Sequence, residues 1–239
     1  MWPVCKKEIR QFFSSLTGYI AIIFFLLLTG VTLFILPDNI LDNGYATLEK
    51  FFQIAPWILL VLIPAITMRS FAEEFRAGTF EILQTLPLTK TQLVGGKYLA
   101  ALIVVIIALV PTLIYPYCLQ QLSTGGGIDS GGTAGSYIGL LLLAASFVSI
   151  GVCCSSFTSN AVVAFIASVF LCVVVYGSFT ALSRLKAFEG GADYYLQMLG
   201  IDFHYQSISR GVVDSRDIIY FLTLTGAFLI ITQRNLIKR

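Results

Sequence analysis

Charged side chains that could bind a partner or take part in chemistry gather in one stretch of this sequence, residues 69–97. Its charges are Arg69, Glu73, Glu74, Arg76, Glu81, Lys90 and Lys97. Phe71 and Phe75 are four residues apart, so on a helix they share one face and leave the charges around the rest. Such a helix lies flat on a membrane face with its apolar side inward, and its charges suit contact with a soluble partner. An ordinary solvated loop is the alternative interpretation.

The residues between these charges predict two short helices followed by a long one. Gly78 suits a helix C-cap, because a residue without a Cβ adopts the left-handed conformation at no steric cost. Thr79 can cap the second helix, and Pro87 stops it because proline lacks an N–H and clashes with the preceding turn. Thr89 and Gln92 have the spacing of a capping box, which predicts that the long helix begins there.

Residues that could catalyse a reaction or hold a cofactor are few. His204 is the only histidine in the sequence, and a hydrogen-bonded interfacial residue is a simpler interpretation than a metal ligand. Gly95-Gly96-Lys97 invites comparison with a phosphate-binding loop, but Thr91 stands where that motif needs its first glycine and Tyr98 follows the lysine. The predicted spans carry no ionisable residue near their centres, although ion-coupled carriers usually need one. We therefore expect no catalytic, metal-binding or cofactor-binding residue.

The composition is typical of an integral membrane protein. Hydrophobic residues make up 57% of the chain and charged residues 12%, with a mean hydropathy of +0.86. A soluble domain carries about 25% charged residues. The 239 residues suffice for about six spans and leave no room for a separate soluble domain. A net charge of +2 is too small to indicate binding to nucleic acid. The predicted fold class is an all-α membrane protein with one domain over residues 1–239.

Uncharged segments predict six transmembrane helices after an interfacial helix over residues 1–13. The predicted spans are 18–36, 52–68, 98–122, 137–154, 160–182 and 218–232. A signal peptide is the alternative for the first segment, but the uncharged run over 11–37 exceeds the ~7–15 apolar residues of such peptides. Pro56 and Pro64 fall inside the second span and predict kinks there. Residues 155–160 are the predicted turn between the fourth and fifth spans.

The longest connection, residues 183–213, precedes the last span. Glycines at 190, 191 and 200 divide it into a short helix over 192–199 and a second helix over 203–210, for which Asp202 is the predicted cap. These pieces suit an interfacial or re-entrant position on the outer side. The candidate functional residues of this connection, expected at headgroup depth, are Tyr194, Tyr195, His204 and Arg210.

The distribution of basic residues orients the chain. Six spans place both termini, residues 69–97 and the 155–159 turn on one side of the membrane. That side holds ten of the fifteen Lys and Arg residues, so by the positive-inside rule it is cytoplasmic. We expect a multi-pass protein of a bacterial cytoplasmic (inner) membrane, in contact with membrane lipid, with both termini in the cytoplasm.

The chain resembles the membrane subunit of a type 2 ABC transporter. The shared features are six spans, a charged cytoplasmic element between the second and third spans, and a long outer loop before the sixth. The local similarity is carried by Arg69-Ser-Phe-Ala-Glu-Glu-Phe-Arg-Ala-Gly-Thr-Phe-Glu-Ile-Leu83, followed by Leu86-Pro87 and Gly96-Lys97. This segment is similar to the coupling helix of that family. Residues 203–217 also resemble the subset that contains the gliding-motility permease GldF and the copper-maturation permease NosY.

The resemblance implies a non-catalytic permease subunit that works with a separate ABC ATPase, present in two copies, and with a second permease subunit in a homo- or heterodimer. The residues implied to face the ATPase are Arg69, Glu73, Glu74, Arg76, Gly78, Thr79 and Glu81. ATP-driven closure of the two ATPase subunits would push on this element, and Pro56 and Pro64 would help the second span to change its angle. A substrate would then be exported. In a GldF-like protein this export would serve gliding motility. The alternatives are a membrane anchor of a motility or secretion machine and an intramembrane enzyme.

Overall fold

The computed structural model describes residues 1–36, 47–85, 87–123, 127–184, 192–212 and 214–238, and within these ranges the chain is helical and contains no strand. The predicted all-α fold class is confirmed. The elements are α1 (Trp2–Ser14), α2 (Leu16–Phe34), α3 (Glu49–Thr67), α4 (Ala72–Ala77), α5 (Thr79–Thr85), α6 (Lys90–Leu109), η1 (Val110–Leu113), α7 (Ile114–Leu122), α8 (Ser130–Phe157), α9 (Ala161–Val173), η2 (Val174–Ser178), α10 (Phe179–Ser183), α11 (Ala192–Gln197), α12 (Ile201–Ser209) and α13 (Ser215–Lys238).

Five helical segments of the described chain are long and apolar enough to cross a membrane: 49–77, 90–122, 130–157, 161–183 and 215–237. A sixth is reached if α1 and α2, which meet at an angle of 74°, count as one bent span. The helix predicted for residues 1–13 is therefore present as α1, and the first predicted span corresponds to α2. These segments make the chain a multi-pass membrane protein.

Several helices extend beyond the predicted spans, because polar caps start them earlier than the apolar runs begin. The capping box of Thr89 and Gln92 is confirmed, and α6 begins at Lys90. Asp129 caps α8 by accepting a hydrogen bond from the Gly132 N–H at 3.0 Å. The predicted turn over 155–160 is too long, since α8 runs to Phe157 and α9 begins at Ala161 after the Asn160 cap.

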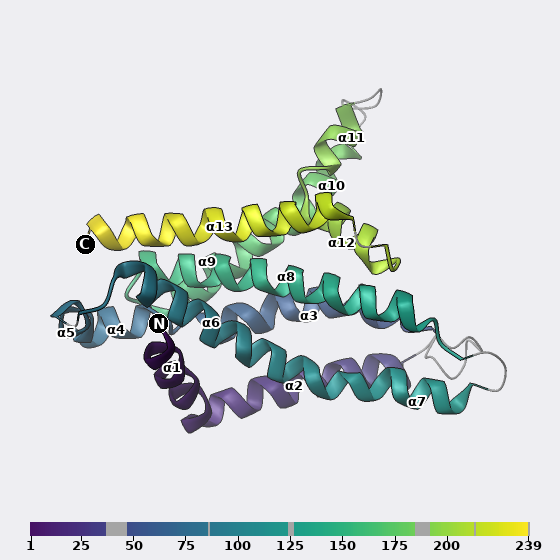
Figure 1. Ribbon diagram of the computed structural model, residues 1–239, viewed down its shortest axis with the longest axis horizontal. Helices are drawn as coiled ribbons and strands as arrows, with labels where there is room; N and C mark the ends of the chain where they lie inside the picture. The colour runs from purple at the N-terminus through teal and green to yellow at the C-terminus, as the bar shows by residue number, and fades with distance from the viewer. Residues whose placement is uncertain (37–46, 86, 124–126, 185–191, 213, 239) are drawn as a thin grey trace.

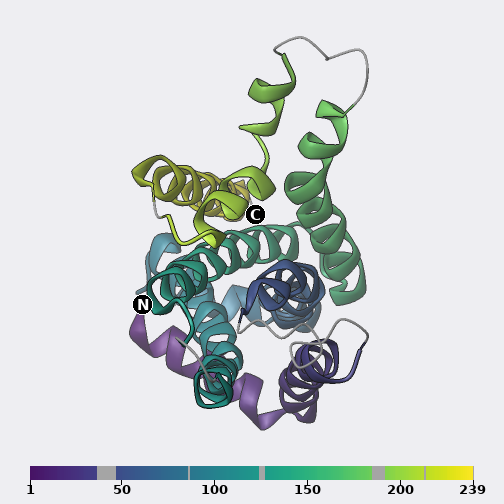
Figure 2. The same ribbon diagram turned by 90° about the vertical axis from the view of Figure 1, so that its right-hand side faces the viewer.

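Helix α8 lies at the centre of the bundle, where it packs against α3, α9, α12 and α13 (Figures 1 and 2). Gly151 lies where α8 and α3 approach each other closely. A Cβ at this position would lie 2.0 Å from the Thr67 Oγ1, so any larger residue would push the two helices apart. Helix α3 continues without interruption through Pro56 and Pro64, both buried, and the predicted kinks remain a prediction.

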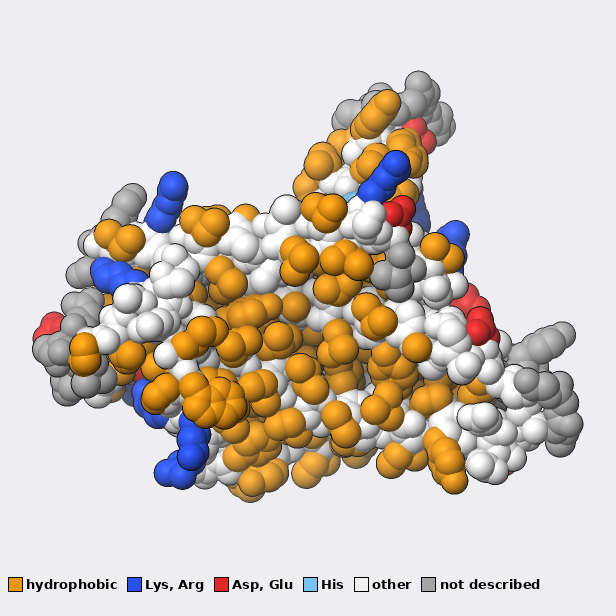
Figure 3. Space-filling model, viewed as in Figure 1, with side chains coloured by type: hydrophobic (Ala, Val, Ile, Leu, Met, Phe, Trp, Pro, Cys, Tyr) orange, Lys and Arg blue, Asp and Glu red, His pale blue; other side chains and the backbone are white. Residues whose placement is uncertain are grey.

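Both termini, the α4–α5 segment and the α8–α9 turn lie at one end of the bundle, which we call the α5 end (Figure 1). Two side chains join segments there: Lys90 donates to the Leu236 carbonyl, and the Asn235 amide donates to the Ser156 carbonyl at 2.7 Å. The opposite end carries α11 and α12 and is called the α12 end. Figure 3 shows a broad apolar surface between the two ends, with charged side chains gathered toward each. The grouping agrees with the predicted topology, whereas the assignment of this end to the cytoplasm stays a prediction.

Candidate functional site

The predicted charged element forms two short helices at the α5 end. Helix α4 ends at Gly78, which adopts the left-handed conformation expected of it, with φ of 69°. Phe71 is fully buried, its ring stacks on that of Phe75, and Phe75 meets Phe80 edge-on at 4.8 Å between centroids. The shared aromatic face predicted from the spacing is therefore directed into the protein, and α5 continues from the turn that Gly78 makes.

Ser155, near the end of α8, holds the start of α4. Its Oγ accepts hydrogen bonds from the Phe71 N–H at 2.9 Å and the Ala72 N–H at 3.1 Å, and it donates to the Met68 carbonyl at 3.1 Å. The side chain thus satisfies backbone groups that a helix N-terminus otherwise leaves unpaired. The sequence prediction had assigned Ser155 to a turn, so it missed this contact between α4 and α8.

A cluster of four charges, of which Lys97 and Glu74 are buried, joins α4 to α1 and α6. The Lys97 ammonium lies 2.9 Å from the Glu8 carboxylate and 2.9 Å from the Glu74 carboxylate, and it also donates to the Ser70 carbonyl. Lys7 completes the cluster at 2.9 Å from Glu74 and 3.4 Å from Glu8. Only 1% of the Lys97 side chain is exposed, compared with 49% for Lys7. Two cations therefore neutralise two carboxylates, with the Lys97 and Glu74 side of the cluster closed to water and the Lys7 side open to it.

The cluster tolerates burial because each charge has an opposite partner, and removal of one partner would leave an uncompensated charge. Partial burial opposes the charge on Lys7, but hydrogen bonding and attraction to Glu74 and Glu8 outweigh it and raise its pKa above the usual value of 10.5. The Lys97 ammonium also lies 4.9 Å from the centre of the Phe71 ring. This arrangement holds three segments in fixed relation.

The structure divides the seven residues predicted to face an ATPase into two groups. Glu74 is buried and is committed to Lys7 and Lys97, so it does not contribute to an exposed surface. The other six are exposed: Arg69, Glu73, Arg76, Gly78, Thr79 and Glu81. The Thr79 hydroxyl donates back to the Glu74 carbonyl at 3.5 Å. The sequence prediction placed Lys97 among the exposed charges. It is buried because it pairs with Glu74 and Glu8.

At the α12 end, His204 forms the hydrogen bonds that the sequence led us to expect. Its Nδ1 lies 2.6 Å from the Asp217 carboxylate on α13, its Nε2 lies 2.9 Å from the Met198 carbonyl, and its ring stacks on Tyr220. His204 and Asp217 are both buried. Within the described ranges, no three His, Cys, Asp or Glu side chains converge in the way a metal site requires.

The remaining predicted residues of the α12 end lie at its surface. Tyr194 and Tyr195 are exposed on α11, and Arg210 follows α12 at the mouth of a cavity of about 890 Å³. Asp202 does not cap α12, because the helix already begins at Ile201 after an extended Gly200. Its carboxylate instead accepts hydrogen bonds from Thr180 at 3.3 Å and from Gln206 at 3.0 Å. The contact with Thr180 joins α12 to α10.

Comparison with known families gives one match. The family described as "ABC-2 family transporter protein" matches residues 2–192, about four-fifths of the chain. The matched range includes α1 through α10 and therefore the whole charge cluster and the α4–α5 segment. A comparison with curated proteins finds no match.

Proposed function

Since the chain belongs to the ABC-2 family of transporter proteins, which are membrane permease subunits of ABC transporters, we propose that its α4–α5 segment is the surface on which the ABC ATPase docks. The observation that carries the proposal is the combination of an exposed charged tip with a rigid attachment. Arg76, Thr79 and Glu81 are exposed on this segment. Ser155 and Lys97, at its base, bind it to α8, α6 and α1.

This arrangement can turn a push on α4 into movement of the spans. Because Ser155 binds three backbone groups at the start of α4, α8 follows any displacement of that helix. Lys97 connects Glu74 of α4 with Glu8 of α1, so α6 and α1 follow too. Helices held in this way shift as packed units, which is how small movements at one site become rearrangements of a bundle.

The complete transporter that we propose contains two permease subunits, identical or different, and two ATPase subunits in the cytoplasm of a bacterium. The α5 end would then face the cytoplasm, in keeping with the ten basic residues that the topology places there. ATP hydrolysis would drive export toward the α12 end. One permease domain would extend over residues 1–239, since α13, beyond the matched range, packs along α8.

Within the family, the similarity of residues 203–217 to the subset of GldF and NosY supports a role in gliding motility. The competing proposal is a membrane anchor for a motility or secretion machine. An ATPase-inactive partner separates them: a transporter loses its function with such a partner, whereas an anchor keeps it.

Docking is tested by co-expressing the permease with its ABC ATPase and purifying the two together through a tag on the permease. The variants Arg76→Glu and Glu81→Lys reverse exposed charges without entering the charge cluster, and each is expected to reduce recovery of the ATPase at least about tenfold. Arg216→Glu is the matched control, because Arg216 is exposed at the opposite end. Unchanged recovery with both docking variants would refute the proposal.

A further inference from the structure

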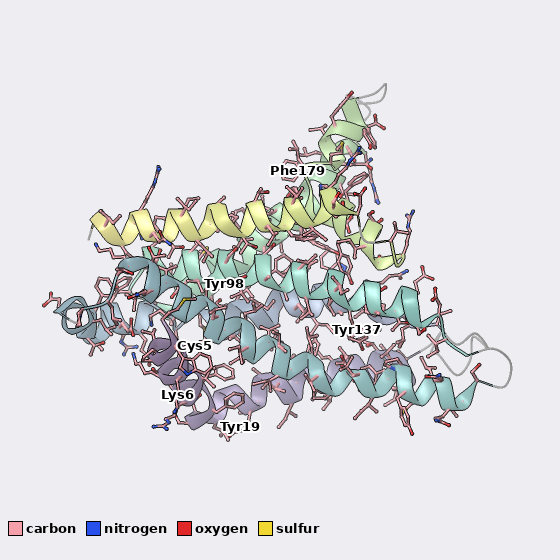
Figure 4. All side chains as sticks on the ribbon, in the orientation of Figure 1. Cys5, Lys6, Tyr19, Tyr98, Tyr137 and Phe179 are labelled. Atoms are coloured by element: carbon pink, nitrogen blue, oxygen red, sulfur yellow. The ribbon has the colours of Figure 1, made fainter. Side chains whose placement is uncertain are left out.

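The elbow between α1 and α2 encloses a pocket of about 320 Å³ whose lining includes Arg69 and Glu73, next to the exposed tip proposed for docking. Helix α1 turns into α2 at 74°, and α3, the start of α4 and α6 close the pocket on its other sides. Figure 4 shows Lys6 on α1 and Tyr19 on α2 near this elbow. An exposed helix that meets a span at such an angle lies along the membrane interface, so the pocket is at headgroup depth.

The lining of this elbow pocket combines polar and apolar side chains. Its apolar part is formed by the side chains of Ala21, Ala65, Ile66, Ala101 and Val104. Its polar part includes Gln11, Ser14 and Ser15 of the elbow together with Arg69 and Glu73. From Lys97 to Val104, α6 advances seven residues along the pocket, or about 10 Å. An elongated cavity with a polar and an apolar part fits a ligand of the same character.

Two opposite charges of the polar part are available to a ligand. Lys97 and Glu8 also line the pocket, but they form an ion pair with each other at 2.9 Å. Arg69 and Glu73 are exposed and take part in no ion pair within the described part of the chain. The polar part therefore offers one guanidinium and one carboxylate, which together match a ligand that carries both a negative and a positive group.

We propose that the elbow pocket binds one zwitterionic phospholipid of the adjacent leaflet. Arg69 pairs with the phosphate, for which a guanidinium is well suited because it donates two parallel hydrogen bonds. Glu73 pairs with the ammonium of the headgroup, and one acyl chain lies against Ala101 and Val104 on α6. A volume of about 320 Å³ is at the small end for ligand sites and accommodates part of one lipid.

This proposal concerns the permease alone and does not depend on an ATPase. The test uses the purified permease in nanodiscs made from equal amounts of phosphatidylethanolamine and phosphatidylglycerol, released into the gas phase and weighed by native mass spectrometry. The wild-type protein is expected to retain one phosphatidylethanolamine molecule. Arg69→Gln is expected to reduce its retention about tenfold, the loss that one charge-assisted hydrogen bond implies.

Glu73→Gln separates a zwitterionic site from an anionic one, because it should remove the preference for phosphatidylethanolamine while a lipid is still retained. Ala101→Leu fills the apolar part and should also reduce retention. Arg10→Gln is the control, since Arg10 is an exposed arginine on α1 that does not line the pocket. The proposal would be overturned if the wild type retained both lipids equally. It would also be overturned if the Arg69→Gln and Ala101→Leu variants unfolded at the wild-type temperature and retained the lipid as the wild type does.

Discussion

One end of this bundle holds a cluster of ion pairs and the other a buried histidine–carboxylate hydrogen bond, and the two contacts join different parts of the chain. At the α5 end, Lys97 binds Glu8 and Lys7 binds Glu74, residues 89 and 67 positions apart, so the cluster joins segments from different parts of the chain. At the α12 end, His204 binds Asp217 only 13 positions away. The first arrangement makes three helices one unit, whereas the second attaches one short helix to its neighbour.

The difference extends to the space around each pair. The α5 end leaves a pocket of about 320 Å³, while the α12 end opens into a cavity of about 890 Å³ that α12 helps to line. Helix α12 is nevertheless also held by distant contacts, since it packs on α8 and the Tyr205 hydroxyl donates to the Phe52 carbonyl of α3 at 2.6 Å. We infer that the charge cluster at the α5 end joins more of the bundle than the His204–Asp217 contact does, and four substitutions test this contrast.

Lys97→Met should have the largest effect, because it leaves the carboxylates of Glu8 and Glu74 with only Lys7 as a partner. Loss of one partner from a buried ion pair costs about 3–5 kcal/mol, and the unfolding temperature in detergent should fall accordingly. The exposed Lys6→Met is the control. Adding Glu8→Leu and Glu74→Leu to Lys97→Met should restore part of the stability. An unchanged unfolding temperature in Lys97→Met would show that the cluster does not join the helices.

Ser155→Ala should come next, since it leaves two buried N–H groups and one carbonyl at the start of α4 without their partner. An unsatisfied buried group costs about 1–3 kcal/mol, and we expect a loss of about 2 kcal/mol. Amide hydrogen exchange should increase over residues 71–77 and leave α12 unaffected. Ser159→Ala, at an exposed position in the following turn, serves as the comparison. Faster exchange in α12 would contradict the separation of the two ends.

Asp217→Asn weakens the pair at the α12 end, and its effect should be smaller and local. The amide still accepts a hydrogen bond but loses its charge, so a loss of about 1–2 kcal/mol is expected. Hydrogen exchange should increase over residues 192–210, while recovery of the ATPase through the α5 end stays as in the wild type. Reduced ATPase recovery would mean that this end is also part of the rigid unit.

Lys7→Gln should have the smallest effect, below about 1 kcal/mol, because half of the Lys7 side chain is exposed and water screens its ion pairs. The raised pKa of Lys7 sets the pH dependence of this contribution. It is complete below pH 10.5, the ordinary pKa, and disappears as the pH rises through the higher pKa of the folded protein. Unfolding temperatures of wild type and variant should therefore differ at neutral pH and converge in strong alkali. A difference that persists there would indicate a packing effect instead.

Features that depend on neighbouring residues could be predicted from the sequence, and features that depend on distant partners could not. Gly78 and the Thr89–Gln92 capping box act within one turn, and both were predicted correctly. Glu73 and Glu74 look alike in the sequence, but adjacent residues of a helix point about 100° apart. Glu74 therefore faces Lys97 while Glu73 faces outward, and only the packing of α1, α4 and α6 decides between them.

The same distinction explains the errors in helix bounds. Ser155 and Ser156 were assigned to a turn because serine is common there, but the Ser156 hydroxyl donates to the Cys153 carbonyl inside α8 and the helix continues. Asp202 was predicted as a cap, yet the extended conformation of Gly200 starts α12 two residues earlier. The partners of Asp202 on α10 and of His204 on α13 lie outside the local sequence, so no local pattern identifies them.

The distance along the chain between Glu8 and Lys97 also sets an order for biosynthesis. Ribosomes add about 5–20 residues each second, so α1 emerges roughly 5–20 s before the lysine that will neutralise its glutamate. During that interval α1 has no docking surface on α6, and Glu8 must stay in contact with water. Helix α1 thus reaches its final position only after α6 has been made.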